Sequence, residues 1–128
     1  MIVLDTHAWI WWVNESEQLS KKATEAINSA TTLGICAISC WEIAMLVAKD
    51  RLGLNQNVMD WINLALTRPK TKLLTLDPRV LVTSTQLPGD FHGDPADRFI
   101  AASCLIHKAP LITKDKQIKN WPHLKVIW

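Results

Sequence analysis

The chain has 128 residues, of which 48% are hydrophobic and 20% are charged. This balance predicts one compact domain, residues 1–128, and excludes an intrinsically disordered chain. The formal net charge of +2 permits a nucleic-acid partner without indicating one, because nucleic-acid-binding domains are often far more basic.

The cysteine pattern excludes two common structural devices. Cys36, Cys40 and Cys104 form no CxxC pair, so neither a disulfide framework nor a zinc site is expected. We expect buried free thiols, a reducing compartment and hence a cytoplasmic location. No signal peptide is expected, because the first apolar run lacks a basic segment and is interrupted by Asp5. The weakly charged residues 28–48 begin with too many polar side chains to span a membrane.

The first part of the chain predicts a buried strand followed by two helices. Ile2-Val3-Leu4 is an apolar run that is typical of a strand buried on both faces. The apolar segment Thr6–Val13 is the expected first helix, with Asp5 immediately before it. Ser20 is expected to cap a second helix, which ends near Thr31.

The next segment predicts a second strand and a helix with a recognisable start. Gly34–Ile38 is expected to be a buried strand. Ser39 and Glu42 match a capping box, in which each side chain satisfies a backbone N–H at the start of a helix. A helix over Trp41–Lys49 therefore follows.

The remaining chain continues the alternation of helices and strands. Helices are expected at residues 58–66, 78–86 and 96–107, after the caps Asn57, Asp77 and Asp94. Strands are expected at residues 72–76, 110–113 and 125–127. This alternation predicts an α/β fold with a mostly parallel sheet of about five strands. Four tryptophans lie on apolar faces of the expected helices, and we therefore expect them in the core: Trp9, Trp12, Trp41 and Trp61.

Acidic residues stand near the expected strand ends and helix starts. Asp5, Glu42 and Asp115 follow three different strands, and parallel strands bring such residues to one edge of the sheet. Simple topology places Asp97 at the opposite edge, unless the loop at residues 87–93 returns it. Each acid also has a local explanation: Asp5 as a helix cap, Glu42 in its capping box and Asp97 beside a helix dipole.

Converging carboxylates would repel one another unless a divalent cation lay among them. Oxygen donors without paired His or Cys favour Mg²⁺ or Mn²⁺ over zinc, and such sites commonly bind phosphate groups. An ion can also activate water for displacement at phosphorus, so the pattern predicts a metal-dependent phosphodiesterase. Lys114 and Lys116, beside Asp115, are by default solvated surface charges, with phosphate contact as the alternative.

Four short motifs, in order along the chain, resemble those of PIN domains and in particular of the VapC-type toxin ribonucleases of bacterial toxin–antitoxin modules. The motifs are Asp5-Thr6-His7-Ala8, Ser39–Ala44, His92–Ala102 and Leu111–Asp115. The resemblance covers essentially the whole chain. It implies a three-layer α/β/α sandwich whose acids converge at the carboxyl edge of the sheet, and it implies that Asp97 reaches that edge.

The resemblance also implies an activity. The implied catalytic residues, which would hold one or two Mg²⁺ or Mn²⁺ ions, are Asp5, Glu42, Asp97 and Asp115. The residues implied to support them are Thr6, Asp94, Arg98 and Thr113. The implied protein is a toxin that cuts RNA with metal-activated water. Its expected RNA contacts are Lys114 and Lys116. The resemblance further implies a small antitoxin that blocks the site, and a homodimer.

Two alternatives stay open. A catalytically silent PIN-like module would bind RNA or protein without cutting, although the presence of all four acids speaks against it. A phosphoacceptor receiver domain has a similar length and sheet order, but it needs an acidic pair after the first strand and an acceptor Asp after the third. Here only Asp5 follows the first strand, and Asp77 leads directly into Pro78.

Overall fold

The computed structural model describes residues 1–128 and contains a five-stranded sheet in which all neighbouring strands are parallel. The strands are β1 (Ile2–Leu4), β2 (Leu33–Cys36), β3 (Thr71–Leu74), β4 (Leu111–Ile112) and β5 (Val126–Ile127). Their order is β3-β2-β1-β4-β5, so β1 lies at the centre. Because every strand runs in the same direction, the residues that follow β1, β2 and β4 meet at one edge of the sheet.

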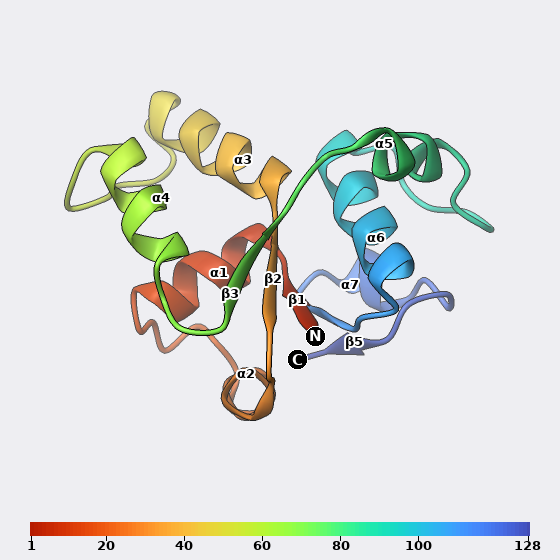
Figure 1. The fold of residues 1–128 in the computed structure, drawn as a ribbon, viewed down its shortest axis with the longest axis horizontal. Helices are drawn as coiled ribbons and strands as arrows, with labels where there is room; N and C mark the ends of the chain where they lie inside the picture. The colour runs from red at the N-terminus through yellow and green to blue at the C-terminus, as the bar shows by residue number, and fades with distance from the viewer.

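Helices cover both faces of this sheet and complete a three-layer α/β/α sandwich (Figure 1). They are α1 (Thr6–Val13), α2 (Lys21–Ser29), α3 (Ala37–Ala48), α4 (Val58–Leu66), α5 (Pro78–Thr85), α6 (Pro95–His107) and α7 (Lys116–Lys119). Helices α1 to α4 pack on one face, and α6 and α7 pack on the other. Helix α5 packs outside the sheet against α6.

The central strand shows how alternating side chains build the two halves of the core. Leu4 belongs to the cluster that contains Trp9, whereas Val3 belongs to the opposite cluster with Ile100. Successive side chains of a strand point to opposite faces, so even a short strand is buried on both sides. Trp9 in turn contacts Trp61 of α4 edge to face, with ring centroids 5.4 Å apart.

The α/β fold class, the parallel sheet and its strand count are confirmed. The expected helix caps are confirmed too: the side chains that accept a backbone N–H of the following helix are Asp5, Ser20, Asn57, Asp77 and Asp94. The cysteines are free, with Cys36 and Cys104 buried and Cys40 half-buried. No helix combines the length and the apolar composition that crossing a membrane requires.

The predicted capping box at Ser39 and Glu42 is wrong. Helix α3 begins at Ala37, and Cys36 is its N-cap without a side-chain cap bond. Strand β2 therefore ends at Cys36 rather than at Ile38, and Ser39 lies inside the first turn, fully buried. The Ser39 hydroxyl pairs with a side chain of α1 instead of a backbone N–H, so the tertiary contact decides where this helix starts.

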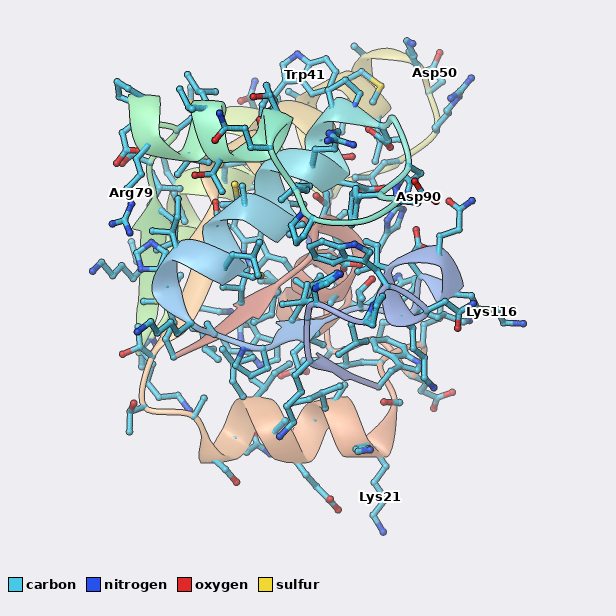
Figure 2. All side chains as sticks on the ribbon, turned by 90° about the vertical axis from the view of Figure 1, so that its right-hand side faces the viewer. Lys21, Trp41, Asp50, Arg79, Asp90 and Lys116 are labelled. Carbon is cyan, nitrogen blue, oxygen red and sulfur yellow. The ribbon has the colours of Figure 1, made fainter.

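Several smaller expectations also need correction. Strand β3 begins at Thr71 and ends at Leu74, and β4 spans only Leu111–Ile112, so both are shorter or shifted relative to the prediction. The short helix α7, which follows β4, was not expected from its mostly polar sequence. Trp41 is 56% exposed and stands at the molecular surface (Figure 2), because it lies on the outer side of α3. Trp9 and Trp61 are buried as predicted, whereas Trp12 is half-buried.

Candidate active site

A pocket of about 510 Å³ opens at the carboxyl edge of the sheet. Its lining residues are Asp5, Thr6, His7, Trp11, Gln18, Glu42, Asp94, Asp97, Ile100, Lys114 and Asp115. They follow the ends of β1 and β4 or lie in or next to α1, α3 and α6, except Gln18, which lies in the loop between α1 and α2. The four acids named from the sequence therefore share one pocket, while their roles as metal ligands stay predictions.

Asp5 is both a helix cap and a pocket acid, so the two explanations that the sequence left open coexist. Its Oδ1 accepts a hydrogen bond from the Ala8 backbone N–H at 2.8 Å, and its Oδ2 accepts one from the Thr113 hydroxyl. Burial raises the pKa of Asp5, while these hydrogen bonds oppose the rise and the negative charge of Asp97 adds to it. The carboxylate is thus held in a fixed orientation at some electrostatic cost.

Glu42 lies in the middle of α3 and is oriented by α1 rather than by its own helix. Its Oε1 accepts a hydrogen bond from the Thr6 hydroxyl at 2.5 Å, and Thr6 Oγ1 is also 2.9 Å from Ser39 Oγ. Thr6 and Ser39 are both buried. Burial raises the pKa of Glu42; the Thr6 hydrogen bond lowers it, and repulsion from Asp97 raises it further.

Asp97 lies in the first turn of α6 and reaches the same pocket, so the opposite-edge expectation is wrong. Helix α5 does not cross the sheet; it stays beside the start of α6 (Figure 1). The two helices are in direct contact, because Arg98 Nε of α6 donates a hydrogen bond to the Ser84 carbonyl of α5 at 2.9 Å. Burial raises the pKa of Asp97, the hydrogen bond with His92 opposes this, and nearby Asp94 adds to it.

Asp115 follows β4 and caps the short helix α7. Its Oδ1 accepts hydrogen bonds from the backbone N–H groups of Gln117 and Ile118, at 2.8 and 3.3 Å. Its own backbone N–H donates to Thr113 Oγ1 at 3.1 Å. Thr113 therefore connects Asp5 and Asp115, and it is fully buried in that position.

The residues expected to support the acids differ in their contacts, and their supporting roles stay predictions. Thr6 and Thr113 contact carboxylates directly. Asp94 caps α6 and also lines the pocket. Arg98 contacts no acid: its guanidinium donates to the backbone carbonyls of Ser84, Phe91 and His92. Arg98 therefore holds the loop before α6, a role that the sequence did not indicate.

One side of the pocket carries a basic and aromatic rim. The Lys114 Nζ lies 6.0 Å from the centroid of the Trp11 ring, and the His7 and Trp11 rings are 5.7 Å apart. Lys114 is exposed and lines the pocket. Lys116 is exposed as well, but it projects outward from α7 (Figure 2) and is not among the pocket residues.

His92 contacts one of the pocket acids, and the sequence did not indicate this contact. Its Nε2 lies 2.7 Å from Asp97 Oδ2. Donor atoms of His92, Asp97 and Asp115 all lie within 4.8 Å of one another. No metal-binding spacing involves this histidine, so its position in the loop directly before α6 is the one sequence signal that could have pointed to it.

The donor set fits a divalent cation. Burial and mutual repulsion both act against the charged forms of Asp5, Glu42 and Asp97. Carboxylates that raise one another's pKa are stabilised when a cation neutralises them. The donors are almost all oxygen, which suits a hard ion such as Mg²⁺ or Mn²⁺.

Comparison with known proteins agrees with this geometry. The model of the PIN domain family matches residues 2–124. The chain belongs to the PIN domain family. Its similarity to Ribonuclease VapC22 of Mycobacterium tuberculosis is 37% identity over 122 residues, which is 95% of this chain and 92% of that protein. The VapC-type resemblance of the motifs is thereby confirmed.

Two solved structures share the fold of this PIN domain. VapBC2 from Rickettsia felis, solved with a DNA fragment from its promoter, has a TM-score of 0.71 and 19% identity, covering 98% of this chain and 97% of that chain. FitAcB from Neisseria gonorrhoeae has a TM-score of 0.68 and 22% identity, covering 98% and 96%. At these identities the likeness shows the fold alone.

Proposed function

We propose that this PIN domain is an Mg²⁺- or Mn²⁺-dependent endoribonuclease and the toxin of a toxin–antitoxin module, with residues 1–128 acting as one domain. The observation that carries the proposal is the meeting of Asp5, Glu42, Asp97 and Asp115 in one pocket. Support comes from the 37% identical relative, which is named a ribonuclease, and from structural neighbours that include a toxin–antitoxin complex from Klebsiella pneumoniae.

Asp5 and Asp97 would be the principal metal ligands, with Glu42 and Asp115 completing the cluster. A bound ion supplies a water of lowered pKa and stabilises the negative charge that develops on the phosphate. The protein's own contribution is orientation: Thr113 fixes Asp5, and Thr6 fixes Glu42. Preorganised groups of this kind lower the barrier because they need little rearrangement during the reaction.

RNA would enter along the rim of the pocket that carries Lys114. An exposed lysine beside the acids can bind a backbone phosphate, and Trp11 and His7 offer ring surfaces close to it. Lys116 would contact RNA outside the pocket. Lys114 is therefore the stronger of the two predicted RNA contacts.

The proposed protein partners are an antitoxin and a second copy of the chain. The structural neighbours VapBC2 from Rickettsia felis and the toxin–antitoxin complex from Klebsiella pneumoniae support the antitoxin. The large exposed apolar side chains support a protein interface; they are Trp41, Met59, Leu64, Leu73, Leu81 and Val82. Light scattering on the isolated chain would test the homodimer.

The function is tested with purified protein and a mixed pool of structured RNAs. Wild type would be incubated with Mg²⁺ or with EDTA, and Asp97→Asn with Mg²⁺. Asp90→Asn is the matched control, because Asp90 is exposed and lies on the loop before α6 but outside the pocket (Figure 2). All proteins would first be shown to fold by circular dichroism.

We expect discrete cuts with wild type and Asp90→Asn in Mg²⁺, and none with EDTA or Asp97→Asn. Cutting by Asp97→Asn at the wild-type rate would contradict the site. If the wild-type protein bound RNA but cut none with any divalent ion tested, the result would instead indicate the silent PIN-like module.

A further inference from the structure

The nitrogen donor of His92 lies beside two of the pocket carboxylates, those of Asp97 and Asp115. His92 Nε2 is 2.7 Å from Asp97 Oδ2, and donor atoms of His92, Asp97 and Asp115 lie within 4.8 Å of one another. Both Asp115 cap bonds use Oδ1, which leaves Oδ2 available to another partner. The three side chains come from the loop before α6, from α6 itself and from the residue that caps α7.

These separations match donors that share one ion. When donors lie about 2.1 Å from an ion, two at right angles are about 3 Å apart and two on opposite sides are about 4.2 Å apart. The His92–Asp97 distance of 2.7 Å lies near the first value, and the 4.8 Å limit on the whole group lies near the second. One cation among all three donors would require side chains to adjust, because the limit of 4.8 Å exceeds the separation of two ligands on opposite sides of an ion.

Phe91 contacts the His92 ring, and Arg98 fixes the backbone that carries it. The Phe91 and His92 rings are stacked, with centroids 4.5 Å apart and an interplanar angle of 20°. Arg98 donates to the carbonyls of both residues, at 2.9 and 3.2 Å, and its guanidinium lies 5.8 Å from the Phe91 ring centroid. A metal-binding histidine needs such support, because a fixed ring presents one nitrogen to the ion.

We propose that His92 is a direct metal ligand through Nε2, forming with Asp97 and Asp115 a mixed nitrogen–oxygen position for a transition-metal ion. This rests on the metal site of the proposed function and adds to it a ligand and a metal preference. Imidazole binds Mn²⁺ and especially Co²⁺ more readily than Mg²⁺, which takes oxygen donors. The pocket therefore selects a transition metal over Mg²⁺ at this position.

A hydrogen bond from His92 to Asp97 accounts for the same 2.7 Å distance if His92 only positions that acid. His92→Gln separates the two roles. Its amide N–H₂ can still donate to Asp97, but an amide nitrogen is not a metal ligand. His7→Gln is the matched control, because His7 lines the pocket that holds Asp97 and Asp115 without belonging to the three-donor group.

The test measures metal binding without RNA. Mn²⁺-loaded protein would be examined by pulsed electron paramagnetic resonance for coupling to a histidine nitrogen, with ¹⁵N-histidine labelling to identify the signal in unaltered protein. Titration calorimetry would give the affinities for Co²⁺ and Mg²⁺. We expect a nitrogen coupling in wild type and His7→Gln that His92→Gln loses, together with a loss of Co²⁺ affinity of about tenfold or more and a smaller loss for Mg²⁺.

A wild-type protein that binds Mn²⁺ without histidine coupling would overturn the inference. So would a coupling that survives in His92→Gln, or equal losses of Co²⁺ and Mg²⁺ affinity, since these outcomes belong to a positioning residue. Failure of the proposed function looks different: a protein that cuts no RNA but shows the His92 coupling still supports the ligand assignment.

Discussion

Thr113, which follows β4, donates its hydroxyl hydrogen to the carboxylate of Asp5, which follows β1, although 108 positions separate them in the chain. Strands β1 and β4 are paired in register, Leu4 beside Ile112, so the residues after them are neighbours. The fully buried Thr113 hydroxyl therefore sets the orientation of a predicted metal ligand through the pairing of two strands.

Thr113→Val should weaken both the fold and the metal site. The substitution keeps the shape of the side chain but leaves Asp5 Oδ2 without its donor, at a cost of about 1–3 kcal/mol in the free energy of unfolding. It should also raise the pKa of Asp5 further, because the lost hydrogen bond stabilised the charged form. Urea unfolding and Mn²⁺ titration would measure the two effects.

Thr113→Ser is the control, since it retains the hydroxyl and should keep most of the Mn²⁺ affinity. If Thr113→Val bound Mn²⁺ as tightly as wild type, the hydrogen bond to Asp5 would have no part in the site.

The metal-free protein should lose stability as the pH rises from about 4 toward neutrality. Burial raises the folded-state pKa of Asp5, Glu42 and Asp97 above their ordinary values of 3.8, 4.5 and 3.8. Between the ordinary and the raised values the folded state binds more protons than the unfolded state, so the free energy of unfolding falls with increasing pH. Urea denaturation at several pH values, with EDTA present, measures this slope.

The slope should be smaller in Asp97→Asn, which removes one of the three groups and its repulsion of the other two. Saturating Mn²⁺ should raise the melting temperature near neutral pH, because an ion that binds the folded state stabilises it. Stability that rises from pH 4 to 7 by the same amount in both proteins would contradict the raised pKa values.

Arg98→Ala should loosen the loop before α6. Arg98 donates to the carbonyls of Ser84, Phe91 and His92. Because water partly replaces the lost hydrogen bonds, we expect the substitution to lower the free energy of unfolding by about 1.5–3 kcal/mol in total. Amide hydrogen exchange should become faster at residues 86–93. Arg79→Ala on α5, where the side chain is exposed (Figure 2), should leave exchange in the loop unchanged.

Lys114→Ala should weaken RNA binding more than Lys116→Ala. Lys114 lines the pocket beside Trp11, whereas Lys116 is not among the pocket residues and projects outward from α7 (Figure 2). Loss of one phosphate contact lowers the slope of log affinity against log salt by about 0.7 for single-stranded RNA. Binding to Asp97→Asn as an inactive background, measured at several salt concentrations, would show this difference. Equal slopes for the two lysine variants would remove Lys114 from the RNA path.

Local features of this protein could be read from its sequence. Asp5, Ser20, Asn57, Asp77 and Asp94 were recognisable as caps, because a cap bond joins residues two or three positions apart. Apolar runs likewise indicated the five strands. Burial on both faces of a parallel sheet requires such runs in the inner strands β2, β1 and β4, whereas the edge strands β3 and β5 are partly exposed. The acids after β1, β2 and β4 could be assigned to one edge, because the carboxyl ends of parallel strands lie at the same edge of a sheet.

The tertiary structure decided what depends on contacts between distant segments. The start of α3 was misplaced because the Ser39 hydroxyl pairs with Thr6, 33 positions away, rather than with its own helix. Asp97 reaches the pocket because α5 stays beside α6, and His92 faces Asp97 because Arg98 holds its loop. Such placements depend on packing between elements, which local sequence patterns do not encode, whereas caps and buried strands depend on the residues immediately around them.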